Sequence, residues 1–292
     1  MIKLIASDMD GTLLDAHMSV SPENAEAIRF ANDAGVEFMV ATGRNYQEAR
    51  AALDEVGIDC AMITLNGAQV FDKEGNSLFT VSIPNNQAIS VLDILDANGI
   101  YYEVATNDGL YSENQAKRIE SFASMVATHL PHLTYKMAIA MASAKLELLH
   151  ITYVDSIRAI LEEKNLEVLK IICFHTEGPA VLGPVGKQIS LLGDLAVTSS
   201  GQNNIEVNHK NAQKGIAVAH VAHERGISLE EVMTIGDNFN DVSMLQVAGV
   251  SFAMGNAEIE VKDYAKYTTD TNLESGVGKA YCARLQKTCS FI

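Results

Sequence analysis

The first 65 residues alternate between short apolar runs and helix signals. Apolar runs at residues 2–7, 36–41 and 61–65 each predict a buried strand. A helix begins at residues 21–23, where a serine cap, a proline at the first helical position and an early acid follow one another, and a second helix spans residues 45–56. Strands and helices at this spacing predict right-handed βαβ units around a parallel sheet.

The pattern changes after residue 69 and returns near residue 211. A turn at residues 72–76 joins two strands of a hairpin, and the stretch that follows mixes helices with strands of antiparallel alternation. We therefore predict an α/β fold with a Rossmann-like, doubly wound parallel-sheet core formed by residues 1–83 and 210–292. Residues 84–209 are predicted to form an inserted α+β domain of ordinary domain size.

One glycine-rich stretch in the insert superficially resembles a phosphate loop. It runs Gly183, Pro184, Val185, Gly186, Lys187, but it lacks the first glycine and the final Ser or Thr of the Walker pattern. We therefore expect an ordinary loop there.

Charge and cysteine content exclude several classes of partner. The 292 residues contain 21 basic and 37 acidic side chains, a net charge of −16, which gives no general attraction to nucleic acid polymers or anionic membranes. No apolar run is long enough to span a bilayer, and Asp8 interrupts the N-terminal run too early for a signal peptide. The 4 scattered cysteines predict free thiols in a reducing compartment. A cytoplasmic protein is expected.

Acidic residues gather where the core strands are expected to end. In a doubly wound sheet this edge carries the function. Four carboxylates packed together would repel one another, and a hard divalent cation with oxygen ligands resolves that repulsion. Mg²⁺ suits such a site when it also holds a phosphate. The carboxylates are those of Asp8, Asp10, Asp237 and Asp241.

The same edge carries groups that suit a phosphoryl anion. The cation, Lys214 and the backbone N–H groups around Gly43 can hold a dianionic phosphoryl group, and the Thr42 hydroxyl can donate to its oxygens. Asp8 and Asp10 are two residues apart, so in extended geometry they point to the same side. One such carboxylate can attack phosphorus, and the other can protonate the leaving alcohol and later deprotonate water.

Four motifs together resemble a known family. They are D-x-D-G-T at residues 8–12, hydrophobic-A-T-G-R at residues 40–44, Lys-Gly at residues 214–215 and G-D-x-x-N-D at residues 236–241. This set is similar to the haloacid dehalogenase superfamily, and more narrowly to its Cof-type phosphatases of subclass IIB. The resemblance runs from residue 2 to about residue 285, and it implies that the insert is a C2-type cap domain.

The resemblance also implies a role for each motif residue. It makes Asp8 the nucleophile and Asp10 the acid/base. It implies that Asp8, Asp237 and the Asp10 carbonyl coordinate Mg²⁺, and that Asp241 supports the metal site. The residues expected to bind phosphate or line the pocket are Thr42, Gly43, Arg44, Asn66, Lys214 and Asn240.

The expected function is Mg²⁺-dependent hydrolysis of small phosphomonoesters through an aspartyl-phosphate. The substrates would be sugar phosphates, nucleotides or flavin-type phosphates, and the cap would close over the site, exclude bulk water and select the leaving group. Two alternatives remain open from the sequence: a phosphomutase similar to phosphomannomutases, and a non-catalytic phospho-ligand-binding protein. A monomer or a weak homodimer is compatible with the sequence.

Overall fold

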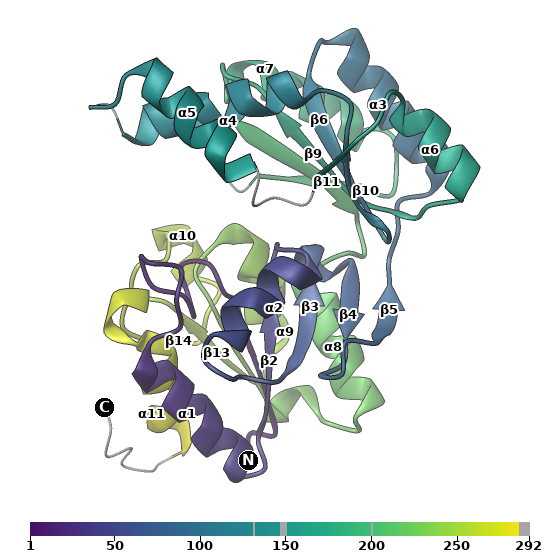
Figure 1. The fold of residues 1–292 in the computed structure, drawn as a ribbon. Coiled ribbons are helices and arrows are strands. Elements are labelled where there is room, and N and C mark those ends of the chain that lie inside the picture. The colour runs from purple at the N-terminus through teal and green to yellow at the C-terminus, as the bar shows by residue number, and fades with distance from the viewer. Residues whose placement is uncertain (131, 147–150, 200, 286–292) are drawn as a thin grey trace. The chain divides into compact units, whose positions relative to one another are not determined.

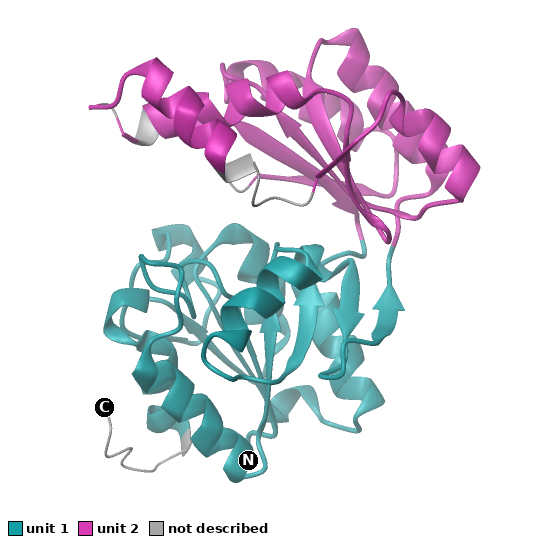
Figure 2. Cartoon of the chain, in the orientation of Figure 1, with its two compact units in different colours: residues 1–81, 211–292 teal, residues 82–210 magenta. Residues whose placement is uncertain are grey.

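The computed structural model describes residues 1–292 except 131, 147–150, 200 and 286–292 (Figure 1). The chain divides into two compact units (Figure 2). Unit 1 comprises residues 1–81 and 211–292, and unit 2 comprises residues 82–210. Within the described ranges, no helix combines the length and the apolar character that crossing a membrane requires.

Unit 1 is built on an eight-stranded sheet with the order β14-β13-β12-β1-β2-β3-β4-β5. The strands from β14 to β3 are parallel, and the β4–β5 hairpin extends one edge in antiparallel fashion. The strands are β1 Leu4–Ser7, β2 Glu37–Ala41, β3 Ala61–Thr64, β4 Gln69–Phe71, β5 Ser77–Thr80, β12 Val232–Gly236, β13 Val250–Ala253 and β14 Tyr267–Thr268.

Helices cover both faces of this sheet. In β1, Ile5 packs with α1, α2 and α11 on one face, whereas Leu4 and Ala6 pack with α8 and α9 on the other. This two-sided burial confirms the predicted doubly wound α/β core. The helical elements are α1 Pro22–Asp33, α2 Tyr46–Asp54, η1 Leu65–Gly67, α8 Lys214–Glu224, η2 Leu229–Glu231, η3 Phe239–Asp241, α9 Val242–Val247, α10 Ile259–Lys262, η4 Asn272–Glu274 and α11 Gly276–Leu285.

Side-chain caps determine where the first two helices begin. The Ser21 hydroxyl accepts a hydrogen bond from the Asn24 N–H at 3.2 Å, with Pro22 as the first helical residue of α1. Asn45 and Glu48 form a reciprocal capping box at the start of α2. Both starts agree with the sequence prediction, because a cap is a local pattern of a few residues.

Unit 2 contains a six-stranded sheet with the order β10-β11-β9-β6-β7-β8. Its pairings are antiparallel except for β7 with β8, so the insert has the predicted α+β architecture. Helices α3, α6 and α7 share one core with the sheet, and α4 and α5 pack against each other in a separate cluster. The elements are α3 Asn85–Ala97, β6 Tyr101–Thr106, β7 Gly109–Ser112, α4 Gln115–His129, α5 Tyr135–Leu146, β8 Ile151–Tyr153, α6 Ile157–Lys164, β9 Val168–Phe174, α7 Pro179–Ser190, β10 Leu195–Thr198 and β11 Asn204–His209.

Two local predictions are wrong. The stretch expected to be a loop around Pro184 lies inside helix α7, where buried Leu182, Val185 and Ile189 recur at helical spacing and pack into the core of unit 2. That burial outweighs the poor helix propensity of proline and glycine. Cys282 is disulfide-bonded rather than free. Cys60 and Cys173 are free and buried, as expected, and Cys289 lies outside the described residues.

Candidate active site

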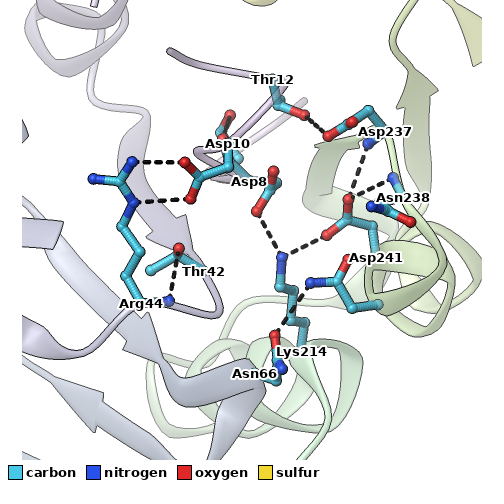
Figure 3. A network of polar contacts seen from close by, with 12 residues as sticks. Asp8, Asp10, Thr12, Thr42, Arg44, Asn66, Lys214, Asp237, Asn238 and Asp241 are labelled. Carbon is cyan, nitrogen blue, oxygen red and sulfur yellow. Dashed lines mark hydrogen bonds and ion pairs between the residues drawn. The ribbon is translucent and has the colours of Figure 1, made fainter. Parts of the chain in front are cut away.

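Parallel neighbours bring the motif residues to one edge of the unit 1 sheet. Strand β1 lies between β2 and β12, and Ser7 is in register with Val40 on one side and Ile235 on the other. The residues that directly follow these strands therefore meet, and Figure 3 shows Asp8 and Asp237 beside each other at this edge. This is the edge at which doubly wound sheets bind their ligands.

Lys214 is a buried cation between two carboxylates. It is the first residue of α8, and its side chain has no solvent exposure. Its Nζ atom lies 2.6 Å from Asp8 Oδ1 and 2.6 Å from Asp241 Oδ1. Burial alone would lower the pKa of Lys214, but the two carboxylates outweigh burial and raise that pKa. The lysine is therefore charged and holds Asp8 and Asp241 at fixed positions.

Asp241 holds the loop that carries Asp237. Its second oxygen, Oδ2, accepts hydrogen bonds from the Asp237 N–H at 2.9 Å and the Asn238 N–H at 3.0 Å. Both oxygens of this fully buried carboxylate are thus engaged by protein donors. The side chain of Asp241 therefore stabilises the turn. Its oxygens are already engaged, so Asp8 and Asp237 are the carboxylates better able to bind a cation.

Three carboxylates in this cluster share one lysine. Oxygen atoms of Asp8, Asp237 and Asp241 lie within 4.8 Å of one another. Burial and the charge of Asp241 raise the pKa of Asp8 well above its ordinary value, although Lys214 opposes the shift. Burial and Asp241 also raise the pKa of Asp237 to about 6. An excess of buried negative charge with free oxygen ligands fits a hard divalent cation such as Mg²⁺.

Gly11 and Thr12 both lie against the side chain of Asp237. The Thr12 hydroxyl donates to Asp237 Oδ1 at 2.7 Å. Gly11 has a φ of +78°, and a Cβ atom there would lie 2.5 Å from Asp237 Oδ2, so only glycine fits. The role of Thr12 was missed by the sequence reasoning, although Thr12 belongs to the D-x-D-G-T motif that was quoted.

Arg44 and Asp10 form a two-pronged ion pair. The guanidinium Nε lies 2.8 Å from Asp10 Oδ2, and a terminal nitrogen lies 2.6 Å from Asp10 Oδ1. The Arg44 N–H in turn donates to the Thr42 hydroxyl at 3.2 Å. Arg44, which was expected to line the substrate pocket, thus binds the side chain of Asp10, the expected acid/base.

Asn66 and Asn240 also contact each other. The Asn240 amide donates to Asn66 Oδ1 at 3.1 Å, and the Asn66 N–H donates to the Thr42 carbonyl at 2.9 Å. A Cβ atom at Gly43 would lie 3.0 Å from Asn66 Oδ1, so the loop after β2 and the short helix η1 approach each other closely. Asn240 Oδ1 is buried and has no hydrogen-bond partner in the described part of the chain.

The motif residues therefore form three groups at one edge (Figure 3). The first is the carboxylate cluster with Lys214, the second is the Arg44–Asp10 pair, and the third is the pair of asparagines beside Thr42 and Gly43. The structural residues that the sequence reasoning missed are Thr12, Asn238 and Ser243, the last of which accepts a hydrogen bond from the Gly215 N–H at 3.0 Å.

Sequence comparison points to one family. Residues 5–280 match the profile of the haloacid dehalogenase-like hydrolases. Phosphatase YwpJ of Bacillus subtilis is 32% identical over 278 residues, which cover 94% of this chain and 97% of the relative. The 5-amino-6-(5-phospho-D-ribitylamino)uracil phosphatase YcsE of the same organism is 31% identical over 96% of this chain and 94% of its own.

Solved structures give the same result. A haloacid dehalogenase-like hydrolase from B. subtilis superposes with a TM-score of 0.84 at 31% identity, covering 96% of this chain and 99% of the other. BT1666 from Bacteroides thetaiotaomicron, from a study of phosphatases of that superfamily, has a TM-score of 0.79 at 25% identity and covers 98% and 96%.

Proposed function

This chain belongs to the haloacid dehalogenase-like hydrolases and is a phosphatase of their Cof type, and we propose that it hydrolyses small phosphomonoesters with Mg²⁺ through an aspartyl-phosphate. One observation carries the proposal. Lys214 holds Asp8 at the sheet edge within a cluster whose negative charge exceeds what the lysine offsets. A phosphoryl dianion can approach a carboxylate nucleophile only where such charge is neutralised.

The donor set defines where Mg²⁺ would bind. Asp8 and Asp237, together with the Asp10 backbone carbonyl, are the proposed ligands, and Asp241 would support them by holding the Asp237 loop. When bound, the ion supplies positive charge that polarises the phosphoryl group. The raised pKa values of Asp8 and Asp237 support this assignment, since burial and the charge of Asp241 raise them and the charge of a bound cation would offset both effects.

Asp8 is the proposed nucleophile in the first half-reaction. A carboxylate oxygen of Asp8 forms a bond to phosphorus while the bond from phosphorus to the ester oxygen breaks. Asp10, protonated at this stage, gives its proton to the departing alcohol oxygen. Lys214 holds Asp8 and offsets charge during the attack. Thr42, the Gly43 N–H and Asn240 are proposed to bind the phosphoryl oxygens.

Water completes the second half-reaction. The Asp10 carboxylate accepts a proton from water as the water oxygen bonds to phosphorus, and the bond between phosphorus and Asp8 breaks. Inorganic phosphate leaves, and both carboxylates return to their starting states. Asp10 thus regains in the second half-reaction the proton that it gave to the alcohol in the first.

The proposed substrates are sugar phosphates, nucleotides or flavin-type phosphates. The names of relatives support this size class, because they include a phosphatase of a ribitylaminouracil phosphate and, at 25% identity, a pyridoxal phosphate phosphatase from Escherichia coli. The insert, unit 2, is proposed to select the leaving group as a cap domain. Neighbouring family members differ in substrate on one fold, so substrate choice must be measured.

The test is phosphate release from a panel of these esters with Mg²⁺ or with EDTA. We expect Mg²⁺-dependent release, and we expect Asp8→Asn to lower turnover about a thousandfold or more, as loss of a nucleophile does. Asp54→Asn, at an exposed carboxylate of the same unit, is the matched control and should keep wild-type activity. Wild-type turnover by Asp8→Asn would refute the nucleophile. Isomerised ester without free phosphate would indicate a mutase instead.

A further inference from the structure

Two carboxylates that leave the same strand are held in different directions. Asp8 is bonded through Oδ1 to Lys214 Nζ, whereas Asp10 is bonded through both oxygens to the guanidinium of Arg44. In Figure 3 the Asp10 carboxylate faces Arg44 at the left of the view, and the Asp8 carboxylate faces Lys214 at the centre. Asp10 also stands outside the group of carboxylates whose oxygens converge within 4.8 Å.

Arg44 is the anchored partner in its pair. Its N–H donates to the Thr42 hydroxyl at 3.2 Å, and its carbonyl accepts from the Leu65 N–H at 2.9 Å. The Arg44 side chain is 19% exposed, whereas that of Asp10 is 48% exposed. A planar guanidinium that binds both oxygens fixes the plane of a carboxylate as well as its position. The backbone of Arg44 is thus held by two hydrogen bonds, and its guanidinium contacts both oxygens of the more exposed Asp10 carboxylate.

The proposed chemistry needs such a restraint. A carboxylate that is half exposed and two residues from Asp8 is free to turn toward solvent, or toward a cation held by the neighbouring carboxylates. Either rotation would remove Asp10 from the leaving oxygen, and small displacements of a proton donor have large effects on rate. The ion pair opposes both rotations.

We infer that Arg44 is a positioning residue that aligns Asp10 for proton transfer and keeps its carboxyl apart from the metal-binding carboxylates. This inference rests on the proposed function and assigns Arg44 a role other than binding substrate.

The dependence of rate on the leaving group separates the two roles. An aryl ester such as p-nitrophenyl phosphate releases a stable anion and needs little acid catalysis, whereas an alkyl phosphate needs a proton. We expect Arg44→Met to lower kcat/KM, which reports the half-reaction that releases the alcohol, about 10- to 100-fold for the alkyl ester, with a loss about tenfold smaller for the aryl ester. Arg44→Lys keeps the positive charge but cannot bond both Asp10 oxygens through a planar group, so it should retain part of the activity that Arg44→Met loses.

A double-mutant cycle gives the second readout. If Arg44 acts through Asp10, Arg44→Met should cost nothing further in an Asp10→Asn background. Arg50→Met is the matched control, since Arg50 also pairs with two carboxylates of the same unit, Asp54 and Asp59, neither of which belongs to the candidate site. It should leave both rates at the wild-type level.

Two results would overturn the inference. Equal losses of kcat/KM for both esters, caused mainly by a higher KM, would show that Arg44 binds the phosphoryl group. Additive losses in the double variant would show that Arg44 does not act through Asp10. If Arg44→Met does not fold, Arg44→Lys and the Asp10→Asn background carry the same comparison. A wild-type protein that hydrolyses neither ester would refute the proposed function itself.

Discussion

Asp237→Asn should stabilise the metal-free protein at neutral pH while weakening its function. Asp237 lies beside Asp8 and Asp241, and Lys214 is the one lysine in this cluster. Burial, the larger cause, and the charge of Asp241 raise the pKa of Asp237 to about 6. Asparagine is neutral, nearly the same shape, and still able to accept the hydrogen bond from Thr12. The substitution therefore removes repulsion with little loss of packing.

The sign follows from proton linkage. A carboxyl whose pKa is higher in the folded state binds its proton more tightly there, so its contribution to stability is fully present below the unfolded pKa of about 3.9 and is lost as pH rises through the folded pKa. A shift of about two units corresponds to about 3 kcal/mol. With these pKa values, about half of that penalty is present at pH 5 and nearly all of it at pH 7.

The assay is denaturant unfolding in EDTA at several pH values between 5 and 8. Relative to wild type, Asp237→Asn should have a higher free energy of unfolding, and its advantage should grow by about 1 kcal/mol from pH 5 to pH 7. Asp54→Asn, at an exposed carboxylate, should show no such growth. An advantage that is absent, or that shrinks as pH rises, would refute the electrostatic reasoning.

Three other predictions concern the same site. Lys214→Met should abolish phosphate release and destabilise the protein by about 3 kcal/mol in unfolding experiments, because its two buried carboxylates lose their cation. Gly215→Ala should cost about 1–3 kcal/mol and lower kcat, since its Cβ would lie 2.2 Å from the Ser243 carbonyl oxygen, whereas Ile216→Ala, at an exposed position of the same turn, should be nearly neutral. Adding Mg²⁺ after EDTA should raise the melting temperature of wild type and restore turnover; an unchanged melting temperature would contradict the metal assignment.

Local patterns allowed much of the fold to be predicted. The strands expected at residues 2–7, 36–41 and 61–65 are β1 Leu4–Ser7, β2 Glu37–Ala41 and β3 Ala61–Thr64, because a run of apolar residues between helix and turn signals leaves little choice. Helix α7 shows the limit of this reasoning. Gly183, Pro184 and Gly186 favour a loop, but the helix is stabilised by burial against a sheet that is distant in sequence. Local propensity cannot include that tertiary contribution.

The site shows the same division between local and long-range information. Motif order predicted which residues reach the edge of the sheet, since parallel strands deliver their ends together. It could not predict their partners. The Arg44 to Asp10 contact joins residues 34 apart, and the Asn240 to Asn66 contact joins residues 174 apart. Such pairs depend on side-chain direction across separate loops, and no spacing within one motif encodes it.

The charge arrangement links stability to metal binding. Burial and the charge of Asp241 raise the pKa of Asp8 and Asp237 in the metal-free protein, and the charge of a bound divalent cation would offset both effects, so the lost stability and the gain on binding have a common origin. Asp237→Asn should then separate them: the variant should be more stable than wild type in EDTA, yet gain less stability from Mg²⁺. A variant with both the higher stability in EDTA and an undiminished response to Mg²⁺ would mean that the cation binds away from Asp237, and that the proposed set of ligands is wrong.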